Sequence, residues 1–173
     1  MKWDRLGKII EKRHQCLIGE DTDGTQWIGS GEAFFAAEDS IHVTKENALA
    51  LCSIDKGKRD RIWVCTWDCG ERFTIMYTKE DEQNLLTPIT TMNDVLLLGS
   101  ADGTLYGVEA RLLKPIDTEN GQAFSLRRME DGSCPVIAVF DDILCGAIVA
   151  PVDGEELGRI MDLCCRIGAM RVE

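Results

Sequence analysis

The chain has 173 residues, a formal net charge of −11 and 45% hydrophobic residues. This length fits one ordinary domain, and the composition is typical of a soluble globular protein and excludes a largely disordered chain. The N-terminal stretch alternates charged with apolar residues, unlike a signal peptide. The longest uncharged apolar run, Ile143–Val152, is far shorter than the roughly 20 residues of a membrane helix. We therefore predict a single cytoplasmic domain over residues 1–173, with no membrane span.

The cysteines lie mostly inside apolar stretches such as "ALALCSI" and "MDLCCRI". A thiol in such a stretch behaves as a small hydrophobic side chain. We therefore expect reduced thiols in the core, which agrees with the reducing cytoplasm.

The first elements follow from hydrophobic spacing. Trp3, Leu6 and Ile10 recur at helical intervals, so residues 3–13 are predicted to form a short amphipathic helix. "QCLIGE" and "QWIG" flank an Asp-Gly pair at residues 23–24, which favours a tight hairpin turn, and "EAFFAAE" is predicted as a third strand.

Further along the chain, Thr44 is a candidate N-cap for a short helix in "KENALALCSI". "RIWVCTW" and "RFTIMYT" are rich in β-branched and aromatic residues and predict a second hairpin. Residues 79–93 are polar and contain Pro88, so we interpret them as a connection.

The same order of elements is predicted for the rest of the chain. "DVLLLGS" and "TLYGV" flank a second Asp-Gly turn at residues 102–103, and a short helix ends at Pro115. "AFSLRRM", "PVIAVF" and "ILCGAIVA" are predicted strands. The last segment has a helical stripe formed by four apolar residues: Leu157, Ile160, Met161 and Cys164.

The recurrence of "DGT" and of a following Glu-Ala pair suggests an internal repeat. We predict an α+β fold with a predominantly antiparallel sheet, made of two similar β-β-α-β-β halves and a C-terminal amphipathic helix packed on the sheet. The halves span about 14–78 and 94–173, joined by 79–93. The alternative is two hairpins that use a common turn independently.

The hairpin formed by "PVIAVF" and "ILCGAIVAP" is apolar on both faces of each strand. Such strands must be covered on both sides. We predict a central place in the sheet, with the C-terminal helix over one face and the other half of the chain, or another subunit, over the second.

Motifs with specific chemistry are missing, and we nominate no catalytic, cofactor-binding or metal-ligating residue. "WIGSGE" has Ile28 where a nucleophile elbow needs glycine, and His14 and His42 are the chain's two histidines. "IGSGEAF" lacks the lysine of a phosphate-binding loop. Cys65 and Cys69 lack the second ligand pair of a structural zinc site.

Two basic segments stand out against the acidic composition. Lys56, Lys58, Arg59 and Arg61 form one group, which we nominate as a phosphate or partner contact, and the first segment is the other, with Lys2, Arg5, Lys8, Lys12 and Arg13. The simpler interpretation of each is a solvated face. Trp27, Trp63 and Trp67 lie in predicted strands, where burial in the core is expected.

Two resemblances add to this interpretation. "LGSADGTLYGVEARLLKPI" and "CPVIAVFDDILCGAIVAP" resemble a strand pair with its helix and the closing strands of one domain of the DNA-polymerase processivity clamps. That resemblance implies helices facing DNA across a ring of several such domains. "QWIGSGEAFF" and "ENALALCSI" resemble small uncharacterised proteins of bacterial prophages.

Three functions remain open. The first is a non-catalytic interaction protein of phage or mobile-element origin that binds another protein through its acidic surface, where complementary charge speeds encounter. The second is a clamp-like DNA-associated module, with a homo-oligomeric ring as one form, that contacts phosphates through residues 56–61, although net charge disfavours nucleic acid. The third is an enzyme whose acid and base come from separate turns.

Overall fold

The computed structural model describes residues 1–69, 73–116, 122–128, 135–141 and 144–170, and only the backbone of residues 68 and 163–170. The described helices are α1 (Trp3–Arg13), α2 (Ala48–Leu51), α3 (Lys56–Arg59), α4 (Lys79–Gln83), α5 (Ala110–Leu113) and α6 (Gly154–Met170). The described strands are β1 (Gln15–Glu20), β2 (Gln26–Ser30), β3 (Ala33–Ala36), β4 (Trp63–Asp68), β5 (Leu85–Met92), β6 (Val95–Gly99), β7 (Leu105–Glu109), β8 (Ala123–Arg127), β9 (Val136–Asp141) and β10 (Leu144–Val149).

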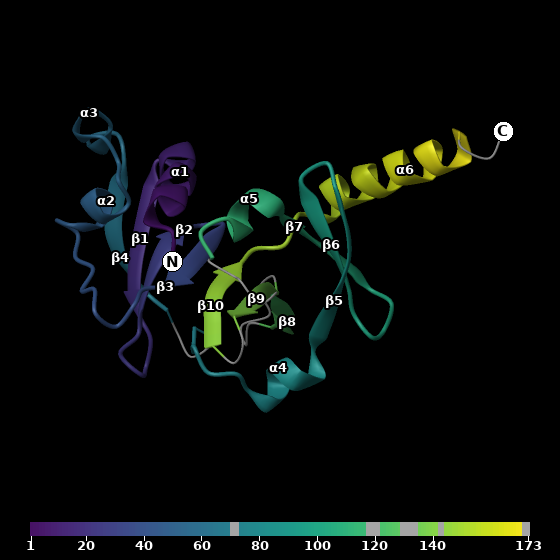
Figure 1. Ribbon diagram of the computed structural model, residues 1–173, viewed down its shortest axis with the longest axis horizontal. Coiled ribbons are helices and arrows are strands. Elements are labelled where there is room, and N and C mark those ends of the chain that lie inside the picture. Colours follow the sequence, from purple (N-terminus) through teal and green to yellow (C-terminus); the bar gives the residue numbers. More distant parts are fainter. Residues whose placement is uncertain (70–72, 117–121, 129–134, 142–143, 171–173) are drawn as a thin grey trace.

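These strands form one ten-stranded sheet in the order β4-β1-β2-β3-β10-β9-β8-β5-β6-β7 (Figure 1). Neighbouring strands are antiparallel, except that β4 runs parallel to β1. The predicted α+β class with a mostly antiparallel sheet is confirmed.

Read outward from the β3–β10 pair, the first three strands on each side follow in reverse chain order, β3-β2-β1 on one side and β10-β9-β8 on the other. Each of these two strands ends a three-stranded antiparallel unit, β1-β2-β3 or β8-β9-β10, and each unit follows a helix, α1 or α5. Both helices lie on one face, because Leu6 and Ile10 of α1 and Leu112 of α5 belong to one apolar cluster. The two units therefore share the order of a helix followed by three strands. The predicted β-β-α-β-β halves are not confirmed.

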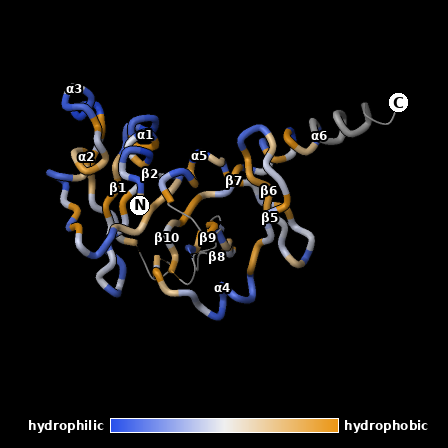
Figure 2. Tube along the Cα trace, viewed as in Figure 1, coloured by the Kyte–Doolittle hydropathy of each residue, from blue (hydrophilic) through white to orange (hydrophobic). Residues whose placement is uncertain are grey.

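The β9–β10 hairpin is central in the sheet, as predicted. Ile137 and Val139 face the cluster that contains α1 and α5, whereas Ala138 and Phe140 face a second cluster that contains Phe73. Figure 2 shows β9 and β10 as hydrophobic stretches, while α3 and much of α1 are hydrophilic. Both faces are thus covered by the chain itself.

The C-terminal helix has a different place from the one predicted. Its described part packs Ile160 against Val95 and Leu97 of β6 rather than over the central hairpin. Beyond this contact α6 extends away from the sheet (Figure 1).

The two Asp-Gly turns have the same backbone geometry. Gly24 and Gly103 adopt φ of 83° and 85°, a left-handed conformation that favours glycine. In each turn the glycine N–H donates to the carbonyl three residues earlier, that of Asp21 or Ser100. The likeness ends after the second strand, because the first Glu-Ala pair leads into β3 and the second into α5.

Two local predictions were wrong, and a third was displaced. The predicted hairpin over residues 61–78 is not found among the described residues 61–69 and 73–78, where β4 pairs with β1 and the later part contributes an isolated bridge between Met76 and Leu144. The predicted connection, residues 79–93, contains α4 and β5. The predicted helix after Thr44 begins later, at Ala48.

Pro88, one reason for interpreting residues 79–93 as a connection, lies within β5. β5 pairs with β8 only through Leu85 and Leu86, so Pro88 lies beyond that contact and next to a bulge in the pairing with β6. Proline is tolerated where a strand has a free side or a bulge, because its missing N–H breaks no ladder bond there.

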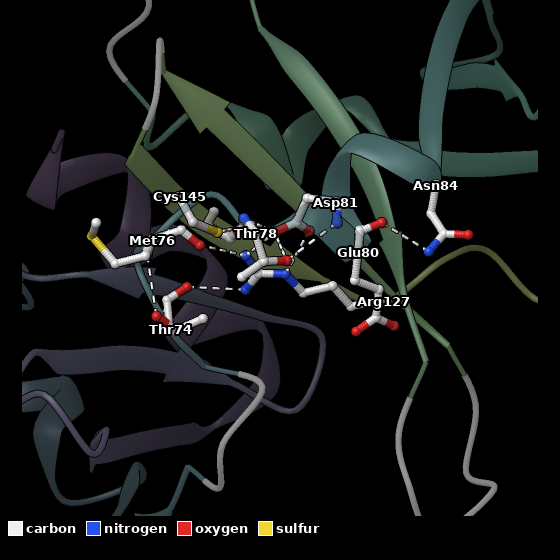
Figure 3. A network of polar contacts seen from close by, with 9 residues as sticks. Thr74, Met76, Thr78, Glu80, Asp81, Asn84, Arg127 and Cys145 are labelled. Carbon is white, nitrogen blue, oxygen red and sulfur yellow. Dashed lines mark hydrogen bonds and ion pairs between the residues drawn. The ribbon is translucent and has the colours of Figure 1, made fainter.

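A buried ion pair explains the course of the segment that follows β4. Arg127 of β8 binds both carboxylate oxygens of Asp81 at 2.8 Å and also donates to the carbonyl of Thr74 at 3.0 Å (Figure 3). Asp81 accepts from Thr78 in the capping box of α4. These bonds hold the segment from Thr74 to Asp81 across the face of the sheet. Arg127 and Asp81 are too far apart in the sequence for their pairing to produce a recognisable local sequence pattern.

Burial of the tryptophans was predicted correctly for Trp27, which is fully buried. Trp63 is 62% exposed and Trp67 is 36% exposed, so the prediction was wrong for Trp63 in particular. Both lie on β4, which is an edge strand. Trp67 stacks on Phe34, with 4.8 Å between the two ring centroids.

Candidate functional site: a basic face on α1 and α5

A stripe of basic side chains runs along the solvent side of α1. Arg5, Lys8 and Lys12 are exposed and spaced at i, i+3 and i+7, which places them within about 60° of one another around the helix. Leu6 and Ile10 on the opposite side are fully buried. Burial of Leu6 and Ile10 therefore keeps the basic stripe on the solvent-exposed side of α1.

The orientation of α1 is set by a close backbone approach. A Cβ atom added to Gly7 would lie 2.1 Å from the carbonyl oxygen of Cys52, just after α2. Only glycine fits there, so α2 supports α1 on the side away from the basic stripe.

Helix α5 and the residue after it add two more cations to the stripe. Arg111 and Lys114 line a depression of about 200 Å³ together with residues of α1. The other lining residues are Arg5, Lys8, Ile9 and Lys12, so the described lining contains no carboxylate. The Lys2 N–H donates to the Pro115 carbonyl at 2.7 Å, which ties the two helices together.

A cluster of ion pairs fixes α1 and α5, the two helices that carry the basic side chains, relative to each other. Glu32, in the turn between β2 and β3, accepts from Arg111 at 2.8 and 2.9 Å and pairs with Arg13 at the end of α1. Arg111 also pairs with Glu109. Glu32 is only 15% exposed, so these interactions are partly shielded from solvent. Hence Arg13 and Arg111 serve the structure of the fold.

The lysines of the stripe have no such role. Among the described residues, Lys8, Lys12 and Lys114 have no ion-pair partner, and Arg5 makes only a 3.6 Å contact with the neighbouring Asp4. Three ammonium groups of this kind around one depression attract an anion, most strongly one with several charges.

The residues nominated from sequence, 56–61, lie next to this face on and after α3. Lys58 pairs with Glu11 of α1 at 2.8 Å, and this hydrogen bond raises the pKa of Lys58. Arg59 donates to the Ile54 carbonyl at 2.9 Å. Within the described part of the chain Lys56 and Arg61 have no ion-pair partner, and Arg61 and Lys58 line a depression of about 220 Å³ together with Glu11.

The nominated group is thus divided by the fold. Lys58 and Arg59 serve local structure, whereas Lys56 and Arg61 have no ion-pair partner among the described residues. From sequence, the first basic segment was interpreted only as a solvated face, and Arg111 and Lys114 were not among the nominated residues. The i, i+3, i+7 spacing of Arg5, Lys8 and Lys12 was a usable signal, but the approach of α5 was not visible locally.

An acidic depression surrounds the first Asp-Gly turn. It has about 310 Å³ and carries Glu20, Glu38 and Asp39 in its lining. The adjoining depression is lined by Asp23 and again by Asp39. The acidic charge of the chain is therefore concentrated in part around this turn, apart from the cations of α1.

Thiol and metal chemistry receive no support from the described residues. Burial raises the pKa of Cys16 to about 12 and that of Cys145 to about 11, so both stay protonated at neutral pH. Cys69 is buried and Cys65 is half-buried on β4. No group of three or more potential metal ligands occurs among the residues that the structure describes.

Comparisons of the chain with known protein families, with characterised proteins and with solved structures give no match. The clamp and prophage resemblances therefore stay expectations from the sequence. The described helices include none that is long and apolar enough to span a membrane. The case for function consequently depends on the geometry of the basic face.

Proposed function

We propose that this protein is a non-catalytic binding module that holds the phosphate backbone of duplex DNA on the basic face formed by α1 and α5. The observation that carries the proposal is the depression between these helices, whose described lining has no carboxylate and includes four cations outside the Glu32 cluster, namely Arg5, Lys8, Lys12 and Lys114. In a chain of net charge −11 such a concentration of positive charge is unexpected for a merely solvated surface.

The geometry suits a polyanion better than a small ligand. Lys8, Lys12 and Lys114 are exposed rather than enclosed, and beyond the end of α1 Lys58 and Arg61 line a further depression together with Glu11. A row of this kind matches successive phosphates along a strand, and lysine contacts phosphate as a mobile point charge. The binding would depend little on sequence.

The repeat in the sheet supports the same proposal. Its two units each begin with a helix on the same face, so α1 and α5 are the equivalent elements of the two units. The clamp resemblance implies helices facing DNA, and here the two equivalent helices border the cationic depression. The acidic remainder of the surface would repel DNA and confine binding to this face.

The test is DNA binding by a triple variant, Lys8→Glu, Lys12→Glu and Lys114→Glu. Reversing three cations that contact phosphate should weaken binding of a short DNA duplex by about 30-fold or more at low salt. The matched control reverses three exposed cations elsewhere: Lys45→Glu, Lys79→Glu and Arg159→Glu.

Both triple variants change the net charge by the same amount, so general repulsion is equal. The control should bind within about threefold of wild type, because a specific face depends on local and not total charge. Equal weakening in both variants, or no retardation of DNA by wild type, would refute the proposal.

A second candidate is favoured by the acidic depression around the first Asp-Gly turn. Glu20, Glu38 and Asp39 there suit a basic segment of a partner protein. Glu20→Lys with Asp39→Lys should then abolish capture of that partner and leave DNA retardation unchanged, which separates the two candidates.

A further inference from the structure

Strand β4 forms one edge of the sheet. The Trp63 N–H donates inward to the His14 carbonyl at 2.9 Å, in line with the parallel register to β1. Because alternate residues of a strand direct their peptide groups to opposite sides, Val64 and Thr66 direct theirs outward. None of the described strands pairs with this outer side.

This edge lacks the usual protection against pairing. Exposed edge strands are commonly blocked by charged residues, proline or a bulge. From Ile62 to Trp67 the chain has neither charge nor proline, and its register with β1 is regular. Trp63 and Trp67, on one face of the strand, are the exposed aromatic residues of this edge.

The opposite edge of the sheet is different. The outward carbonyl of Gly107 in β7 accepts from the Val152 N–H at 2.8 Å, and Leu157 of α6 packs close to Gly107. A second copy could not add its β4 there without displacing this contact. Head-to-tail growth of the sheet is therefore obstructed, and a symmetric contact is favoured.

We propose that β4 pairs antiparallel with β4 of a second copy to form a closed twofold dimer. With Cys65 at the axis, Val64 lies opposite Thr66 of the second copy, so that outward peptide groups meet as a hydrogen-bonded pair. The same register places Trp63 opposite Trp67 of the second copy, an aromatic cross-strand pair.

Charge in the sequence agrees with this register. Arg61 precedes the strand and Asp68 ends it, so antiparallel pairing brings residues of opposite charge to each end. Such a contact is isologous and closes without leaving a free β4 edge.

The dimer also has a geometric consequence for the basic face. A twofold axis that relates antiparallel strands of one sheet is perpendicular to that sheet, so α1 and α5 of both copies lie on the same side. Dimerisation itself does not depend on DNA binding, and the two proposals can fail separately.

The experiment is sedimentation velocity over a wide concentration range without DNA. Wild type should reach twice the chain mass of 19.3 kDa, and Thr66→Lys should remain monomeric. The matched control, Ile89→Lys, places the same charge on an exposed residue of β5 and should still dimerise. Circular dichroism of each variant checks the fold.

A second measurement tests the dimer even if the Thr66→Lys variant fails to fold. In wild type the amides of Val64 and Thr66 should exchange slowly in concentrated solution and fast in dilute solution, and Trp63→Lys should remove that difference. A wild type that stays monomeric, a larger ring, or a folded Thr66→Lys that still dimerises would overturn the proposal.

Discussion

The two faces of the sheet use arginine in different ways. On one face Arg127 is held by both oxygens of Asp81, and the pair is almost completely buried. On the other face Arg111 shares Glu32 with Arg13, at partial exposure, while lysines nearby have no carboxylate partner among the described residues. The first arrangement fixes the fold, and the second leaves positive charge available for a ligand.

The contrast explains why an acidic protein can have a basic site. A buried cation needs its full complement of acceptors, because an unpaired buried charge is very costly. An exposed lysine on a helix does not, since water solvates it. Function is therefore expected where cations are exposed and unpaired, and stability where they are buried and paired.

The largest expected effect is on the buried pair. Asp81→Ala should lower the free energy of unfolding by about 3–5 kcal/mol, because Arg127 is left buried without its carboxylate. Urea unfolding measures the change. Glu155→Ala, which removes an exposed partner of Arg159, should cost less than about 0.5 kcal/mol. Similar losses of unfolding free energy in the two variants would contradict the distinction between the buried and the exposed ion pair.

The same pair predicts an acid transition. Burial by itself would raise the pKa of Asp81, but the hydrogen bonds from Arg127 and Thr78 lower it below its ordinary value. A lowered pKa stabilises the fold above the unfolded value of about 4, and this stability disappears as pH falls through the folded value. Asp81→Asn should flatten the decline of the urea midpoint below about pH 5. An unchanged pH profile would contradict this assignment.

An intermediate effect is expected at Glu32, which lies beneath the basic face. Glu32→Gln removes the carboxylate shared by Arg13 and Arg111, and should lower stability by about 1–3 kcal/mol. Because Arg13 would lose its carboxylate partner and Arg111 would keep only Glu109, DNA affinity should rise by about threefold. Glu156→Gln, at an exposed residue of α6, makes the same charge change elsewhere. A fall in affinity at Glu32→Gln would place the binding face elsewhere.

The smallest effect is expected beyond the end of α1. Lys56→Glu with Arg61→Glu should weaken DNA binding by about three- to tenfold, less than reversal of the stripe itself. Lys58→Gln with Arg59→Gln should affect stability more than binding, since both side chains already have protein partners. If the Lys58 and Arg59 variant lost more DNA affinity than the Lys56 and Arg61 variant, this division of the four nominated residues would be contradicted.

Periodicity predicted the elements whose partners are near in sequence. The helix over residues 3–13, the first Asp-Gly hairpin and the central β9–β10 pair are confirmed. The parallel pairing of β4 with β1 and the strand through Pro88 were missed, because each depends on what lies beside the strand and not on its own pattern.

The candidate site was predicted in pieces. Its charges were visible on the first segment and at residues 56–61, but the sequence could not show that α5 brings Lys114 beside Lys8 and Lys12. Nor could it show that Lys58 and Arg59 are already bonded. Ion pairs between residues 79 positions apart, such as Glu32 and Arg111, decide which cations remain available.

The most direct test of the binding face is the salt dependence of DNA affinity, compared between wild type and the triple variant Lys8→Ala, Lys12→Ala, Lys114→Ala. If these lysines contact phosphates, the slope of log affinity against log salt concentration should become shallower by about 2.7, or about 0.9 for each lysine removed. A slope identical to that of wild type would contradict the proposed binding face, because the three lysines would then touch no phosphate.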